Sequence, residues 1–300
     1  MYDHVENFKI YLESKNNSDN TIDAYEADIK RFHIFCQEHF DSEDVQISDV
    51  STEIIRYYLI RLIDKKLTNR TIARNISSLR MFFRYLLLFQ QIKINPMKKI
   101  HSPKYTKKLP HFFSPTEITN LCNLPNTDTF EGIRDKAIIE LFYSSGLRIS
   151  ELVNLRLQDI NFTKKTLTIF GKGNKKRIVP LTEIALEYIK KYINIRDHRI
   201  DTFFQTKDNE PFTRHKLYSN IKKYINLLNL RAGYSPHTIR HTFASHLLNN
   251  GANLFAIKQM LGHASLSTTE IYTHINPANV RKEYIQGHPR AEKKLIKNHE

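Results

Sequence analysis

The chain has 300 residues, of which 40% are hydrophobic and 26% charged, a size and composition that suit two globular domains. Its formal net charge of +15 at pH 7 favours a polyanionic partner, and nucleic acid is favoured over an anionic membrane surface because the charge is spread along the whole chain. Two separate cysteines exclude a disulfide framework, and the lack of a signal peptide or an apolar run of ~20 residues favours a cytoplasmic protein without membrane contact.

Residues 1–90 are predicted to form a first, all-helical domain. Helical spacing of apolar residues indicates helices over 21–40, 52–64 and 68–90. Four arginines fall within about a 120° arc of the third helix, opposite its apolar side: Arg70, Arg74, Arg80 and Arg84. None has an acidic residue four positions away, so contact with DNA phosphates is favoured over a merely solvated face.

Residues 91–110 are predicted to be a basic linker. The stretch is rich in lysine and proline and has no acidic residue. We expect an extended linker of this kind to follow a DNA backbone, with Lys104 and Lys107 among the contacts. A merely flexible connector is the alternative.

A second domain is predicted over residues 111–300. The period of the apolar pattern changes once, over 166–181, where two short runs of β type flank a glycine-rich turn and indicate a hairpin. Elsewhere capping signals predict helices beginning at Ser114, ending at Gly146, beginning near Ser150, and covering 183–195, 235–251, 253–262 and a short segment after Ser267. The expected fold is therefore mainly α with a small β-hairpin or sheet.

Six residues of this second domain could together carry a metal-free attack on a phosphodiester. Arginine forks suit the anionic phosphate oxygens, a lysine or histidine can protonate a leaving oxygen, and a phenol can attack if its site is strongly positive. Each signal is weak alone, and the ordered combination is far more specific. In chain order the candidates are Arg148, Lys172, His237, Arg240, His263 and Tyr272.

This order of residues resembles the tyrosine site-specific recombinases of the phage integrase family. The stretches that carry the resemblance are GLRISELVNL, GKGNKKRIVPL, HTIRHTFASHLL, LGHASLSTTEIYTH and HPRA. They look most like the bacterial Xer branch, and the resemblance extends over nearly the whole chain. It implies an N-terminal SAM-like core-binding bundle, a C-terminal catalytic domain and a terminal tail exchanged between protomers.

The resemblance also implies a role for each candidate. Arg148 and Arg240 would bind the scissile phosphate, and His263 would donate a hydrogen bond to it. Glu151, within the first motif, would position its neighbours without taking part in the chemistry.

The remaining candidates would move protons and form the covalent bond. By resemblance, Tyr272 would attack the phosphorus and form a 3′-phosphotyrosyl link. Lys172 would act as general acid toward the 5′-oxygen, and His237 would assist proton transfer. Because the link conserves the bond energy, rejoining would need neither ATP nor a metal, and no cofactor is expected.

A zinc site is the competing interpretation of two histidines. His237 and His241 are four residues apart on a predicted helix, as zinc ligands can be, but no glutamate base lies between them and Arg240 would bring a cation beside the ion. We therefore expect no metal, and we expect structural hydrogen bonds from His241 and His246.

The partner implied by the resemblance is a double-stranded DNA recombination site. Four protomers, alike or of two kinds, would assemble on two such sites, and a DNA translocase is left open as an activator. The expected role is resolution of chromosome or plasmid dimers. The alternatives are a mobile-element integrase or transposase, a type IB topoisomerase and a non-enzymatic DNA-binding protein, and the sequence alone does not decide among them.

Overall fold

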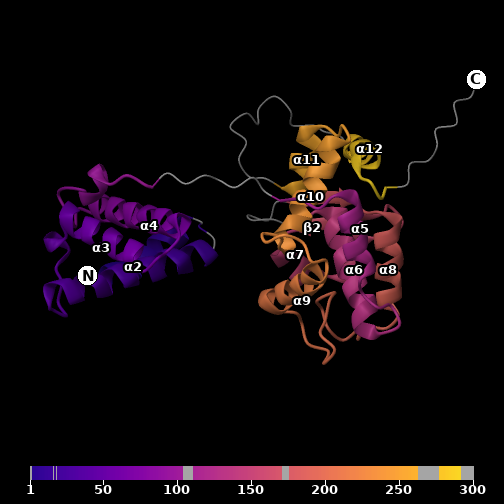
Figure 1. The fold of residues 1–300 in the computed structure, drawn as a ribbon, viewed down its shortest axis with the longest axis horizontal. Coiled ribbons are helices and arrows are strands. Elements are labelled where there is room, and N and C mark those ends of the chain that lie inside the picture. Colours follow the sequence, from indigo (N-terminus) through magenta and orange to yellow (C-terminus); the bar gives the residue numbers. More distant parts are fainter. Residues whose placement is uncertain are drawn as a thin grey trace, which may run out of the picture. The chain divides into compact units, whose positions relative to one another are not determined.

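A computed structural model describes residues 2–15, 17, 19–103, 111–170, 176–262 and 277–291. The chain divides into two compact units, Met1–Lys108 and Leu109–Glu300 (Figure 1). Helices dominate both units and one three-stranded sheet lies in the second, so the expected fold class is confirmed. Within the described part of the chain, no helix is long and apolar enough to cross a membrane.

Helices, turns and loops make up the described residues of the first unit, and no strand occurs among them. Its α-helices are α1 (Tyr2–Ser14), α2 (Asp19–Phe40), α3 (Thr52–Asp64) and α4 (Asn69–Leu88), with short 3-10 turns η1 (Ile47–Asp49) and η2 (Pro96–Lys99). The hydroxyl oxygens of Ser51 and Thr68 accept backbone N–H groups in the first turns of α3 and α4, which is why the chain enters each helix there.

An aromatic core holds these helices together. Phe8 of α1, Phe32 of α2 and Tyr58 of α3 are buried beside Phe82 and Phe83 of α4, with ring centroids 5.0–6.2 Å apart in the contacting pairs. Met97 and Ile100 are buried in the same core. The first residues of the predicted linker therefore pack on this unit, whereas Lys104 and Lys107 lie outside the described residues.

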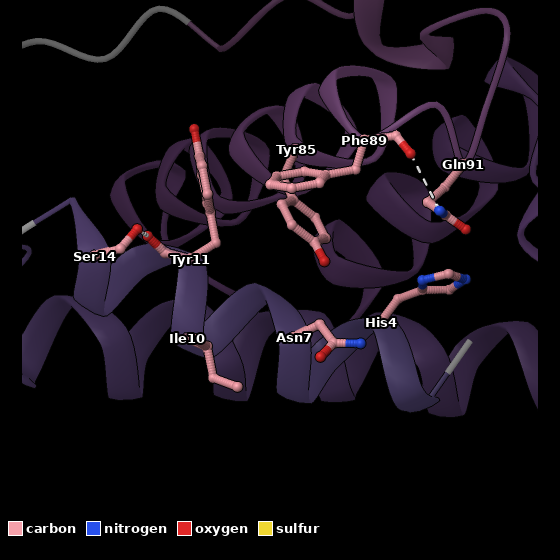
Figure 2. A pocket seen from close by; sticks show the side chains of 8 residues that line it. All are labelled: His4, Asn7, Ile10, Tyr11, Ser14, Tyr85, Phe89 and Gln91. Carbon is pink, nitrogen blue, oxygen red and sulfur yellow. Dashed lines mark hydrogen bonds between the residues drawn. The ribbon is translucent and has the colours of Figure 1, made fainter.

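A shallow groove of about 510 Å³ runs along this unit between α1 and the end of α4 (Figure 2). Tyr11, Tyr85 and Phe89 line it, with ring centroids 4.9–6.0 Å apart. Gln91 closes one end, and its side chain donates to the Phe89 carbonyl at 3.1 Å. None of the candidate site residues lines this groove.

The second unit contains the remaining helices and the sheet. Its helices are α5 (Pro115–Asn123), α6 (Phe130–Ser145), α7 (Ile149–Val153), η3 (Leu157–Asp159), α8 (Glu183–Ile193), α9 (Arg214–Leu227), α10 (Pro236–Asn249), α11 (Leu254–Leu261) and α12 (Pro277–Gly287), and its strands are β1 (Ile160–Asn161), β2 (Thr166–Phe170) and β3 (Lys176–Pro180). The expected capping box at Ser114 and Glu117 is present at the start of α5.

Helix α6 is the centre of this unit. It is buried along almost its whole length, because α5 and α8 lie beside it and α10 packs across it (Figure 1). The sheet has the order β1-β2-β3, and the antiparallel pairing of β2 with β3 confirms the predicted hairpin.

Helix α12 packs on its own chain, against α10, α11 and β3. The hydroxyls of Tyr284 and Ser144 are 2.9 Å apart, and Tyr284 also donates to the Ser144 carbonyl at 2.9 Å. After the helix, His288 is fully buried against Tyr143, and Arg290 forms an ion pair with the buried Glu140 of α6. The HPRA stretch therefore fixes the end of α12 to α6.

Candidate active site

The turn after α6 determines where Arg148 lies. Helix α6 ends at Gly146, whose φ of 58° is in the left-handed region, and a Cβ atom there would lie 2.4 Å from the Phe243 ring. Arg148 is the residue that precedes α7, and its backbone N–H donates to Glu151 Oε2 at 2.6 Å. Its side chain is 43% exposed, so the guanidinium lies at the surface, where an anion can reach it.

Arg240 reaches the same place from α10. Its Nη1 donates to the Gly146 carbonyl at 2.6 Å and its Nη2 to the Leu261 carbonyl at 2.7 Å. Arg148 Nη2 donates to the next carbonyl along the chain, that of Gly262, at 3.2 Å. Both arginines are thus fixed by backbone oxygens at helix ends.

Glu151 lies among three arginines. Its carboxylate accepts from Arg148 Nη1 at 3.0 Å, and Arg240 Nη1 lies 3.9 Å away. Arg177 of β3 forms a two-pronged pair with it, Nη1 to Oε1 and Nη2 to Oε2, both at 2.7 Å. Three cations and one carboxylate leave the cluster with two positive charges, in a place where the side chains of Arg177 and Arg240 are only 7% and 12% exposed.

The charges of this cluster change the pKa values of its members. Burial alone would raise the pKa of Glu151, but hydrogen bonds from Arg177 and from the Arg148 backbone reverse this effect and lower it. Burial, and then the charge of Arg148, lower the pKa of Arg240 to about 10. Glu151 is therefore ionised at neutral pH, and Arg240 is in a place that favours an added anion.

His237 lies in the first turn of α10, three residues before Arg240, and its ring remains solvent-accessible. Partial burial lowers its pKa, and the nearby charges of Arg214, His241 and Arg240 lower it further. A histidine with this tendency is neutral at pH 7 and can accept a proton.

Three of the six candidates lie outside the described residues. Lys172 falls between the end of β2 and the start of β3, and His263 directly follows Gly262. Tyr272 lies within the gap that ends at α12. The described residues bring together Arg148 and Arg240, and they place the chain just before His263 at the same cluster.

Sequence reasoning missed Arg177. A usable signal was present, because buried and exposed side chains alternate along β3 and Arg177 stands on the same side as the buried Val179. An arginine at an inward position of a strand needs a buried acceptor, and Glu151 is that acceptor.

The arginines predicted to meet DNA on α4 have different surroundings. Arg70 and Arg84 are exposed. Arg74 pairs with Asp28 of α2, whose side chain is completely buried, and donates to the Ala24 carbonyl at 3.0 Å. Arg80 donates to the Ile100 carbonyl at 2.6 Å. The acidic partner of Arg74 was not foreseen because it is 46 residues away in the sequence.

The other histidine and cysteine side chains singled out in the sequence lie in the interior or away from any metal-binding group of the described residues. His246 is buried and its Nδ1 lies 2.8 Å from the Tyr143 hydroxyl, which confirms its structural role. Cys36 and Cys122 are both buried and free. Across the described ranges, no three His, Cys, Asp or Glu side chains are grouped so that they could hold a metal ion.

Comparison with known proteins identifies the family. Residues 111–279 match the phage integrase family, and residues 5–89 match the phage integrase N-terminal SAM-like domain. The chain belongs to the phage integrase family. It is 38% identical over 283 residues to the tyrosine recombinase XerD of Shewanella oneidensis, covering 92% of this chain and 93% of the relative. The resemblance to tyrosine recombinases, drawn from the motifs, is thus confirmed.

Solved structures agree on the fold. The XerH site-specific recombinase bound to a palindromic difH substrate has a TM-score of 0.69 and 22% identity, covering 88% of this chain and 79% of that one. A lambda integrase tetramer bound to a Holliday junction has a TM-score of 0.70 and 17% identity, covering 92% and 80%. This family member therefore shares the architecture of recombinases that have been solved on DNA.

Proposed function

We propose that this tyrosine recombinase cuts and rejoins double-stranded DNA at a specific site with Tyr272 as its nucleophile. The observation that carries the proposal is the gathering of Arg148, Arg177 and Arg240 around the one carboxylate of Glu151, with two positive charges left over. A phosphodiester carries one negative charge and gains more on its non-bridging oxygens as it is attacked. A cluster with surplus positive charge, in which Arg177 and Arg240 are largely shielded from water, stabilises that change.

The chemistry assigns one step to each group. The Tyr272 oxygen attacks the phosphorus and its proton passes to His237, the bond from phosphorus to the 5′-oxygen breaks, and Lys172 gives that oxygen a proton. His237, whose pKa is lowered by partial burial and nearby cations, serves as a proton carrier beside the phosphate. His263 donates a hydrogen bond to a phosphate oxygen. In the reverse direction a 5′-hydroxyl attacks the phosphotyrosine, so no ATP is consumed.

The two units together contact the DNA duplex. The exposed arginines of α4 supply phosphate contacts from the first unit, and the predicted linker adds Lys104 and Lys107. Four protomers, alike or of two kinds, assemble on two sites; a lambda integrase tetramer bound to a Holliday junction supports the number of protomers. Within that assembly the segment after Tyr272 leaves its own chain and docks on a neighbour.

The biological role we propose is resolution of chromosome or plasmid dimers, with a DNA translocase as activator. The identity of 38% to a tyrosine recombinase named XerD, over 92% of the chain, favours this role over mobile-element integration. A type IB topoisomerase is less consistent with the family match over residues 5–89.

Trapping the covalent complex tests the proposal. Wild-type protein and Tyr272→Phe are each expressed in cells, the DNA bound through a protein–DNA covalent bond is recovered, and its ends are sequenced. We expect recovered DNA from the wild type, with protein on the 3′ end, and none from the variant. Equal recovery from both would show that Tyr272 is not the nucleophile.

The distribution of recovered sites tests the role. Dimer resolution predicts one strongly enriched chromosomal site close to the replication terminus, whereas an integrase predicts sites at the ends of a mobile element. Truncation after Pro277 is expected to weaken cooperative binding to the recovered site. Sedimentation that shows unchanged assembly by the truncated protein would contradict the docking of its terminal segment.

A further inference from the structure

Arg177 has no role in the reaction as described so far, although it is the most deeply buried member of the arginine cluster. We infer that Arg177 is a positioning residue for strand cleavage: by occupying both oxygens of Glu151, it leaves Arg148 and Arg240 available to the scissile phosphate. The inference rests on the proposed function, because it concerns the same phosphate site.

The geometry of Glu151 supports this role. The fork of Arg177 faces the carboxylate squarely, with both N–O distances at 2.7 Å, whereas Arg148 reaches it through one side-chain nitrogen at 3.0 Å and Arg240 stays at 3.9 Å. The planar, two-pronged arrangement is the strongest that an arginine and a carboxylate can form. Of the three arginines, Arg177 is therefore the strongest partner of Glu151.

The consequence concerns the donors that remain. Arg148 and Arg240 each use two terminal nitrogens on described acceptors, and an arginine has five N–H groups. The others can meet a phosphate. Without Arg177, a buried carboxylate would lack its main partner, and the guanidiniums of Arg148 and Arg240 are the cations within 4 Å that could replace it. A guanidinium that turns to pair with Glu151 is no longer available to the scissile phosphate.

Arg177 also links the segments that carry the undescribed candidates. Its Nε donates to the Met260 carbonyl at 2.9 Å, and a Cβ on Gly262 would lie 3.0 Å from its Cδ. His263 follows directly on that side. On the other side, Arg177 is the second residue of β3, five positions after Lys172. One buried side chain thus sets the spacing between the β3 strand, α7 and the end of α11.

The test uses a synthetic duplex that carries the DNA site recovered by covalent trapping. Full-length protein in excess over this duplex cleaves it in a single turnover. Arg177→Met is expected to lower the rate of covalent complex formation about 100-fold, the cost of displacing groups by about 1 Å, with unchanged affinity for the duplex. Arg177→Lys, which keeps the charge without the fork, is expected to fall in between. Arg196→Met is the matched control, since Arg196 is equally buried but donates to the carbonyls of Ile200 and Thr202.

Two further measurements separate positioning from a general loss of structure. Adding Glu151→Gln to Arg177→Met removes the competing carboxylate and is expected to restore cleavage at least about tenfold. A duplex with a neutral methylphosphonate at the scissile position needs less of the positive charge of Arg148 and Arg240. On that duplex the gap between wild type and Arg177→Met is expected to shrink to about threefold, whereas a folding defect would persist on both duplexes.

Each outcome decides one question. If the wild type forms no covalent complex on the recovered duplex, the proposed function fails. If the wild type is active and Arg177→Met equals it, or if the defect is changed neither by Glu151→Gln nor by the methylphosphonate, the positioning role is refuted. Should Arg177→Met not fold, the same comparison is made with Arg177→Lys in place of methionine, with and without Glu151→Gln.

Discussion

The buried histidine that follows α12 predicts that acid weakens the second unit. His288 is fully buried, stacks on Tyr284 and has its Nε2 3.3 Å from the Tyr143 carbonyl, while its Nδ1 accepts the Arg290 backbone N–H at 3.2 Å. Burial, together with the charges of His246 and Arg290, lowers its pKa from 6.5 to about 3, although the hydrogen bond to the Tyr143 carbonyl acts in the opposite direction. The folded protein therefore keeps His288 neutral at pH values where the unfolded chain protonates it.

The direction and size of the effect follow from this difference. Because the folded pKa lies below the unfolded one, stability is complete above pH 6.5 and is lost as the pH falls toward 3. At pH 5, which is about 1.5 units below the ordinary value, the loss from His288 alone is about 2 kcal/mol. The pKa of His246 is also lowered by burial, so it adds to the loss in the same direction.

Urea unfolding followed by circular dichroism, at pH 8 and pH 5, measures this loss. His288→Phe keeps a ring in the cavity and cannot titrate, so its stability is expected to fall about 2 kcal/mol less than that of the wild type between the two pH values. The lost hydrogen bonds cost the variant stability at both pH values and cancel in the comparison. Parallel pH dependences for the two proteins would refute the burial of a neutral His288.

Three further outcomes are expected. Gly146→Ala places a Cβ against Phe243 at a left-handed residue and should cost about 1–3 kcal/mol in thermal unfolding. Cleavage should also be lost because Arg240 binds the Gly146 carbonyl, and an unchanged melting temperature would contradict the close contact between Gly146 and Phe243. Arg74→Ala removes one of the two arginines that pair with the buried Asp28, leaving Arg31, and should cost about 1–3 kcal/mol. Arg84→Ala should stay within about 0.5 kcal/mol, although both variants weaken DNA binding in a gel-shift titration. Affinity for duplex DNA should fall at least about 1,000-fold between 50 and 200 mM salt, and a flat response would rule out phosphate contacts as its source.

Strong local signals made much of the fold predictable. The helix over 52–64 and the capping box at Ser114 were found where expected, because each is marked by its own cap and apolar spacing. Helices α9 and α12 were missed. In α9 the buried residues are Leu217, Ile221 and Ile225 in a strongly basic segment, and Thr213, which caps the helix, was the signal to follow. The buried side of α12 is thinner still, with two apolar residues, Val280 and Tyr284.

The active site was predictable only in part. The positions of Arg148 and Arg240 follow from motifs whose order is recognisable along the chain, and the structure brings the two together around Glu151. The pairing of Arg177 with Glu151 joins residues 26 positions apart on different elements, and the partner of Arg74 lies further away still. Sequence spacing cannot specify such pairs, because they depend on how separate elements pack.

Helix α6 connects the terminal segment with the reaction centre. Tyr143 and Ser144 hold α12 and His288, and two residues later the Gly146 carbonyl holds Arg240. If α12 left its own chain, the polar groups of Tyr143 and Ser144 on α6 would be exposed, less than one helical turn from the Gly146 carbonyl. In the proposed exchange of the terminal segment, the loss of α12 from Ser144 would therefore act on the same helix end whose Gly146 carbonyl holds Arg240.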